Sequence, residues 1–279
     1  MPAIASTKAY AQAAARPSGA PAARFADLLA AEWIKFRSVR SSYWALLLAA
    51  VPSVLVGILI AQNVSSNWTQ LNAQKDFHFE ALASSFDGFQ FSQLVIGVLG
   101  VLVISSEYTS GLIRTTLAAV PHRHAVLGAK AAVLGIIALV SGEILAFVAF
   151  FSVQAILHGV GIGLSITDSG ALRAVLSAGF YLAVIGLVGL ALGALLRHSA
   201  GAIAALFGLV FVLPGVISAF PAPWKTRIGK FLPTNLAGQL ISQQPHPDLL
   251  SRSWSFAVLL AYPVVLLVLA GYALKHRDA

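Results

Sequence analysis

The sequence predicts an all-α polytopic membrane protein with six transmembrane helices and an N-terminal interfacial amphipathic helix. Hydrophobic residues make up 58% of the 279 residues, charged residues only 10%, and the mean hydropathy is +0.84. A soluble domain is about one quarter charged, so this composition points to a membrane. Uncharged apolar runs recur at about the 20-residue length that a helix needs to cross a bilayer. Lipid offers no partner to an unpaired backbone group, which favours helices, and the alternation typical of membrane barrel strands is absent from the sequence.

The chain begins with residues 1–24, which are rich in Ala, Pro and Ser and have no apolar core. We expect a disordered cytoplasmic tail there, because a signal peptide would need an apolar stretch after its basic start. Residues 25–42 are the expected interfacial helix, and the apolar face read over 25–44 would comprise Phe25, Leu28, Leu29, Trp33, Phe36 and Tyr43. The rest of its surface would carry the charged residues Glu32, Lys35, Arg37 and Arg40. Aromatic residues opposite basic ones are typical of a helix lying on the inner leaflet, and a solvated helix packed on the protein is the alternative.

Residues 43–279 are predicted to form one six-helix transmembrane domain. The predicted spans are 43–62, 88–106, 131–157, 174–196, 199–220 and 253–274. An even number of spans places both termini on the same side of the membrane. Of the 18 Lys and Arg residues, that side would hold twelve and the other side six. The positive-inside rule therefore predicts a multi-pass protein of the cell (plasma) membrane with both termini in the cytoplasm.

A polar segment, "EYTSGLIRTTLAAVP", follows the second predicted span and would face the cytoplasm. We expect Ser106 to cap a short helix that begins at Glu107. Glu107, Gly111 and Arg114 are spaced four and then three residues apart, so they would share one helical face. Pro121 disfavours helix at the residue before it and would end the element. An ordinary loop with a salt bridge is the alternative interpretation.

Several function classes are disfavoured by what the sequence lacks. It contains no Cys, which excludes thiol chemistry and thiolate metal sites. Neither a phosphate-binding Gly-x-x-x-x-Gly-Lys loop nor a His-Glu-x-x-His motif is present. An intramembrane hydrolase would need a base in the middle of a span, whereas His158 and His198 fall at span ends, so we expect no enzyme. The pair His122 and His124 lacks further ligands nearby, so neither a metal nor a cofactor is expected. The net charge of +8 is attributed to residues that flank the spans, and no nucleic-acid partner is expected.

Two features inside the predicted spans have open interpretations. Glu143 interrupts the third span near its middle. A carboxyl group at that depth serves either as a hydrogen-bonded structural contact or as part of a polar pathway. Gly186, Gly189 and Gly193 form a small-residue stripe on the fourth span, which would pack against a helix of the same chain or of a second copy.

The order of these features resembles the membrane permease subunit of a type-2 ABC transporter (the ABC-2 permease family), over about residues 25–276. The motif that carries the resemblance comprises Glu107, Tyr108, Gly111, Arg114, Thr116, Leu117 and Pro121. A second, looser match is "LPTNLAG" at 232–238, in an outer segment, 221–252, for which we expect one or two short helices.

The resemblance implies a division of labour between proteins. Helix 107–120 would be a coupling helix that docks on a separate cytoplasmic ABC-type ATPase subunit, with Glu107 and Arg114 in contact with it. Tyr108, Gly111 and Pro121 would belong to the same ATPase-coupling site. A second permease subunit, identical or homologous, would complete a non-catalytic membrane channel, with export as the expected direction. The main rival is a secondary transporter driven by an ion gradient through Glu143.

Overall fold

The computed structural model describes residues 24–74, 79–112, 115–116 and 123–276. Within these ranges the chain has helices and no strands, and six helices are long and apolar enough to cross a membrane. The predicted fold class is therefore confirmed. Arg114, Leu117 and Pro121, which belong to the motif of the expected coupling site, lie outside the described residues, as does nearly all of the expected N-terminal tail.

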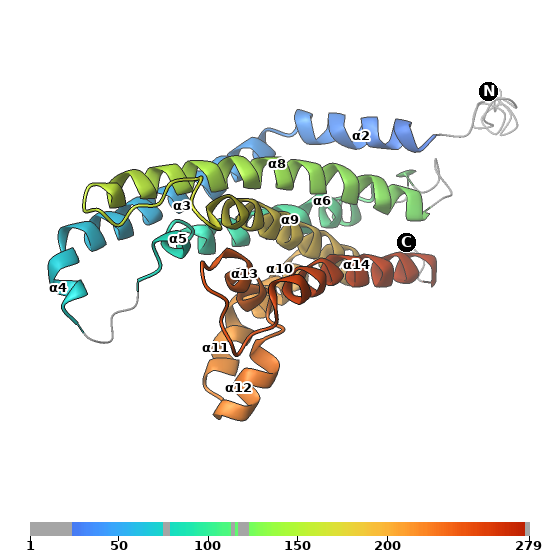
Figure 1. Ribbon diagram of the computed structural model, residues 1–279. Helices are drawn as coiled ribbons and strands as arrows, with labels where there is room; N and C mark the ends of the chain where they lie inside the picture. The colour runs from blue at the N-terminus through green and yellow to red at the C-terminus, as the bar shows by residue number, and fades with distance from the viewer. Residues whose placement is uncertain (1–23, 75–78, 113–114, 117–122, 277–279) are drawn as a thin grey trace, which may run out of the picture.

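The helices follow the order of the predicted spans (Figure 1). Five spans are continuous helices: α3 (Arg40–Ser66), α6 (Phe89–Thr109), α8 (Arg123–His158), α9 (Ala171–Leu196) and α14 (Arg252–His276). The remaining span is assembled from α10 (Ser199–Phe207), the π-helix η1 (Gly208–Val212) and α11 (Leu213–Ser218). Shorter helices are α2 (Phe25–Ser38), α4 (Trp68–Asn72), α5 (Ala81–Ser84), α12 (Ala222–Gly229) and α13 (Pro233–Ile241).

Helix α8 is much longer than the span predicted for it. Its 36 residues amount to about 54 Å, whereas the hydrocarbon of a bilayer is about 30 Å thick. The prediction started this span after Lys130, because a charge usually ends an apolar run. In the structure Lys130 is inside the helix and 1% exposed, so the helix continues past it to Arg123.

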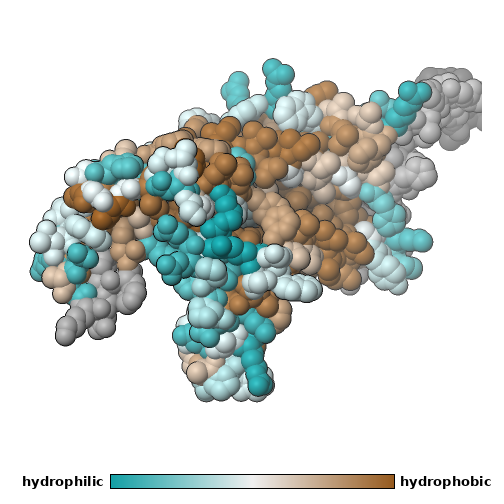
Figure 2. Space-filling model, in the orientation of Figure 1, coloured by the Kyte–Doolittle hydropathy of each residue, from teal (hydrophilic) through white to brown (hydrophobic). Residues whose placement is uncertain are grey.

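Helix α9 is the centre of the bundle. In the 18-residue apolar stretch of α9, 72% of the residues are buried. The corresponding shares are 22% in α3 and 28% in α14. It packs mainly against α6, α8 and α14, which surround it in Figure 1. Figure 2 shows a broad hydrophobic area along the bundle, with hydrophilic side chains at both ends of the view and along the projecting part, as expected for a helix bundle that crosses a membrane.

The glycine stripe of α9 packs against α6 of the same chain. A Cβ placed on Gly189 would lie 2.1 Å from the carbonyl oxygen of Gly97, and one on Gly100 would lie 2.0 Å from that of Gly186. A Cβ on Gly193 would lie 2.8 Å from the carbonyl oxygen of Val101. The two backbones therefore approach as closely as small residues allow, which decides between the two interpretations of the stripe in favour of an internal seam.

The segment 221–252 forms short helices, as predicted. Figure 1 shows α11 and α12 projecting from the bundle, while α13 returns to pack on α14 and α9. The hydroxyl of Tyr262 donates a hydrogen bond to the carbonyl oxygen of Phe231 (2.8 Å), and Asn235 Nδ2 donates to the carbonyl oxygen of Gly229 (2.8 Å). These contacts fix the "LPTNLAG" stretch at one end of the bundle.

Candidate functional site

Helix α2 packs on α8 with a charged residue at the centre of its buried face. Leu28, Leu29 and Phe36 are partly buried there, and Glu32, which lies between them on the helix, is 8% exposed. Trp33 points elsewhere and is 49% exposed. The sequence interpretation placed Glu32 on the polar surface, and this was wrong. Apolar periodicity identifies a face, but it does not show which residue meets a buried partner on another helix.

The predicted helix 25–42 is also interrupted. Helix α2 ends at Ser38, and α3 begins at Arg40, with Val39 between them in an extended conformation. Tyr43, which was assigned to the apolar face of the interfacial helix, therefore belongs to α3. The bend allows α2 to lie beside the first part of α8 while α3 continues along the bundle (Figure 1).

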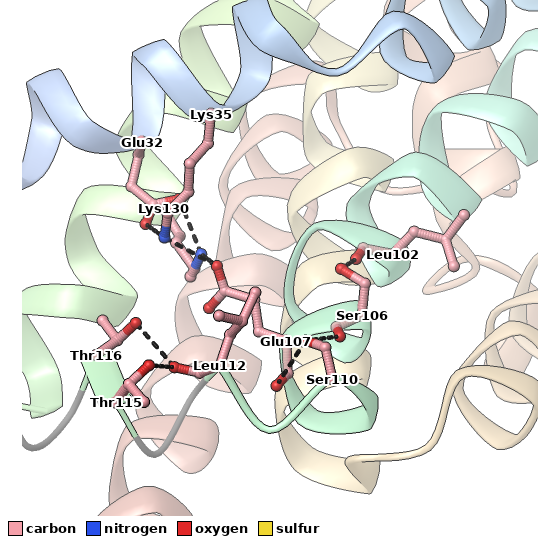
Figure 3. Close-up of polar contacts among 10 residues, drawn as sticks. All are labelled: Glu32, Lys35, Leu102, Ser106, Glu107, Ser110, Leu112, Thr115, Thr116 and Lys130. Carbon is pink, nitrogen blue, oxygen red and sulfur yellow. Dashed lines mark hydrogen bonds and ion pairs between the residues drawn. The ribbon is translucent and has the colours of Figure 1, made fainter.

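Glu32 belongs to a cluster of four charged side chains, which we call the ionic cluster: Glu32 and Lys35 from α2, Glu107 from α6 and Lys130 from α8 (Figure 3). Lys130 Nζ lies 2.6 Å from Glu107 Oε1 and 2.8 Å from Glu32 Oε2. Lys35 Nζ lies 3.0 Å from Glu107 Oε1 and 2.8 Å from Glu32 Oε1. Each carboxylate thus contacts both lysines, and the cluster joins three helices.

The ionic cluster is internally neutral, which is what allows it to be buried. Lys130 is 1% exposed and Glu107 is 7% exposed. A buried charge without a partner is very unfavourable, but two carboxylates and two ammonium groups at hydrogen-bond distance compensate one another. Burial alone would lower the pKa of Lys35, yet its hydrogen bonds to Glu32 and Glu107 outweigh this effect and raise the pKa above its ordinary value. Lys35 therefore contributes to the cluster as an ammonium ion at neutral pH.

The end of α6 differs from the prediction. Ser106 does not cap a new helix, because α6 runs without interruption to Thr109 and contains Glu107 in its last turn. Ser106 Oγ instead donates to the carbonyl oxygen of Leu102 (2.6 Å), and Ser110 Oγ donates to that of Ser106 (2.8 Å). The Ser106 hydroxyl, which suggests a helix start in the sequence, thus bonds to a carbonyl within an existing helix.

Gly111 ends α6. Its φ of 72° lies in the left-handed region, which glycine adopts without strain. Because of this turn, Glu107 and Gly111 do not share one continuous helical face as predicted. Helical geometry resumes at Leu112, whose carbonyl oxygen accepts hydrogen bonds from the hydroxyls of Thr115 (2.8 Å) and Thr116 (3.0 Å). Leu112 is 57% exposed.

Tyr108 anchors the same turn of α6 to other helices. The guanidinium carbon of Arg197 lies 5.5 Å from the centre of the Tyr108 ring, within the range of a cation–π contact. Arg197 connects α9 to α10, and nearby Ser199 Oγ donates to Ser105 Oγ of α6 (2.8 Å). Glu107 and Tyr108 therefore hold the last turn of α6 by contacts with different helices.

Glu143 lies away from this cluster, at the contact of α8 with α9. A Cβ on Gly179 of α9 would lie 2.4 Å from the carboxyl carbon of Glu143, so the absence of a side chain at Gly179 makes room for the acid. Glu143 is partly exposed, but its Oε2 is buried and has no hydrogen-bond partner among the described residues.

Sequence reasoning found one member of the ionic cluster and missed the other three as site residues. Glu32 and Lys35 were regarded as surface charges, and Lys130 as a residue that sets orientation. A signal was present in the last case, because Lys130 stands alone within "AVLGAKAAVLG". A single charge in so apolar a stretch needs a partner, and Glu107 at the end of the preceding span was a candidate.

The fold and this site define a polytopic helical membrane protein in which ion pairs join three helices at one end. Its sequence has no phosphate-binding loop of its own. A family model described as "ABC-2 family transporter protein" matches residues 28–215, well over half of the chain. The chain belongs to this family, which confirms the resemblance found in the sequence. A comparison with curated protein sequences gives no match.

Family membership gives the coarse function. The chain is a permease subunit of an ABC transporter, a membrane transport component of a kind that is generally not catalytic. Such a family implies an ABC-type ATPase as partner, and the six apolar helices agree with a multi-pass membrane protein.

Proposed function

We propose that the chain is the membrane subunit of an ATP-driven exporter and that residues 107–120, the coupling segment, receive motion from a separate ATPase subunit. The observation that carries this proposal is the ionic cluster. It fixes the last turn of α6, from which the coupling segment leaves, to α2 and α8. A segment that transmits motion needs such a rigid base, because a push on a flexible loop would be absorbed locally.

The geometry suggests different roles within the coupling segment. Glu107 and Tyr108 face other helices of the chain, so they serve as anchors of the segment, and their contact with the ATPase is indirect. Gly111 sets the direction in which the chain leaves α6. Leu112 exposes an apolar side chain next to polar residues, which suits the surface of a soluble partner. Arg114 and Pro121, by resemblance, belong to the same docking element.

The transport cycle then follows from two states of the partner. ATP binding favours a closed pair of ATPase subunits over an open pair, and the permease follows because its coupling segments bind that pair. Two permease subunits, identical or homologous, surround the substrate route in the plasma membrane. Both termini lie in the cytoplasm on the side of the ionic cluster, which agrees with the excess of basic residues there.

The rival mechanism uses Glu143 as a proton or ion carrier. What favours it is the buried Oε2 without a partner among the described residues, since a carrier acid must exchange its proton. With ATP held constant, an uncoupler would abolish transport by such a carrier, and so would Glu143→Gln. An ATP-driven permease would retain transport in both tests.

Leu112→Asp tests the docking proposal. The chain is purified from its membrane together with the ATP-hydrolysing subunit that it retains, and the ATPase activity per permease is measured. We expect the variant to insert normally but to lose the ATPase subunit or its stimulation, because a carboxylate replaces an apolar contact. Ile228→Asp, at a residue 42% exposed on α12, is the matched control and should leave both unchanged. Unchanged co-purification and ATPase activity in Leu112→Asp would refute the docking site.

A further inference from the structure

A groove separates α8 from α14 at the end of the bundle that carries the ionic cluster. Its volume is ≈ 500 Å³. It forms because α14 packs chiefly on α9 and touches α8 only lightly. Gly128 and Gly271 line it from the two helices, and a Cβ on Gly271 would lie 3.1 Å from His124 Nδ1 and 3.9 Å from Leu127 Cδ2. Leu127, Leu267 and Val268 make its apolar wall.

The groove faces outward, and no described part of the chain covers it. Val268 is 66% exposed and Tyr272 is 63% exposed, both on the groove side of α14. At the level of a bilayer, water does not fill a space of this kind, because the apolar lining offers it few partners. An acyl chain of a lipid fits such a surface in shape and polarity.

One end of the groove is basic. Lys275 and His124 line it, and the ring of His276 contacts that of Tyr272 with centroids 4.3 Å apart. Among the described residues, no carboxylate belongs to the lining. His124 lies about 9 Å from Lys130 along α8, at about 1.5 Å per residue. The basic end therefore lies at headgroup level, just beyond the helix turns that the ionic cluster joins.

We infer that this groove binds one anionic glycerophospholipid, with an acyl chain along Gly128 and Gly271 and the headgroup phosphate at Lys275 and His124. Basic pockets between membrane helices on the cytoplasmic side recognise anionic headgroups. A second copy of the chain fits less well. A two-fold axis along the membrane normal would bring the basic ends of both grooves to the same depth in one interface, where like charges repel. The inference uses the membrane orientation but does not depend on coupling to an ATPase.

The test measures which lipids the purified chain retains in a mild detergent. Native mass spectrometry compares phosphatidylglycerol with phosphatidylcholine of the same acyl chains. We expect phosphatidylglycerol to be preferred, Lys275→Glu to weaken that preference about tenfold or more, and Lys275→Arg to keep it. Gly271→Leu fills the groove, so retention of the bound lipid should fall even though the charges remain. Lys225→Glu, an exposed lysine on α12, is the matched control and should behave as the unmodified chain.

Three results would overturn the inference. Equal retention of both lipids would show that charge is not recognised. Full competition by soluble glycerol 3-phosphate would show a phosphate site without a role for the acyl chain. Conversion of a dimer to a monomer by Lys275→Glu, without a change in lipid retention, would show that a second copy covers the groove. A failure here leaves the Leu112→Asp test unaffected, so the two proposals can fail separately.

Discussion

Lys130 is the residue on which the ionic cluster depends most. It is among the largest side chains that are almost completely buried in the described part of the chain, and it bonds to carboxylates from two helices. Its Nζ lies within hydrogen-bond distance of both Glu32 and Glu107, so a buried amine and two acidic groups depend on one another. Removing one partner of a buried pair is much more costly than never having the pair, because the remaining charge stays buried.

Lys130→Met is therefore expected to destabilise the chain by about 3–5 kcal/mol. Glu107 and Glu32 would share Lys35 alone, and Lys35 is more exposed. Thermal unfolding in detergent measures the effect, with Lys225→Met as the control that should change stability by less than about 0.5 kcal/mol. Adding Glu107→Gln to Lys130→Met should recover part of the loss, since it removes one uncompensated charge. A Lys130→Met chain as stable as the unmodified one would show that the cluster is not held together as described.

The helices themselves show which parts of the structure can be predicted from sequence. The existence and the order of the six spans follow from the lengths of the apolar runs, and these lengths can be read from consecutive residues. The cluster depends on contacts between residues as far apart as Glu32 and Lys130, separated by 98 positions, and periodicity does not contain that information. The error at Ser106 has a similar origin, because a hydroxyl near a helix end bonds to amides at a start or to carbonyls at an end. Which of the two a hydroxyl bonds to depends on where the preceding helix ends, and here the left-handed turn at Gly111 ends it.

The seam between α6 and α9 gives a prediction at the scale of packed helices. In Gly189→Ala the new methyl group would lie 2.1 Å from the carbonyl oxygen of Gly97, a backbone atom that cannot turn away. The helices must separate, and we expect a loss of about 1–3 kcal/mol in thermal unfolding. Gly215→Ala is the control, because a Cβ there has no neighbour within 4 Å. It should be neutral or stabilising by up to about 1 kcal/mol. Equal effects of the two substitutions would refute the seam.

The turn at Gly111 gives a prediction for the coupling segment. Gly111→Ala would strain a residue with φ of 72° by about 1–2 kcal/mol and redirect the chain after α6. We expect the ATPase activity of the purified complex to fall while the membrane domain remains folded. Gly161→Ala is a close control, since Gly161 also has a positive φ of 78° and open space around its Cα, but lies beyond the other end of α8. If both variants lower ATPase activity alike, the effect comes from general instability and the role of Gly111 is wrong.

At the scale of the whole molecule, the two ends of the bundle are built differently. One end is joined by the ionic cluster and carries the start of the coupling segment, the opposite end carries α4 and α5, and α11 and α12 project from the bundle away from the cluster (Figure 1). The central helix α9 connects the ends and packs closely on α6 through glycines. A displacement of the α6 terminus is therefore expected to reach the far end of the bundle through these packed helices.

The most direct test of ATP coupling is the distance between the coupling segment and α12, measured in the presence of the partner ATPase. The sequence contains no Cys, so spin labels can be attached at Thr115→Cys and Ile228→Cys without first removing native cysteines. We expect ATP binding to the partner ATPase to change the distance between the labels, and Lys130→Met to abolish the change while ATP still binds. A label distance that stays the same with and without ATP, or that responds to an ion gradient when the ATPase is absent, would contradict the proposed coupling.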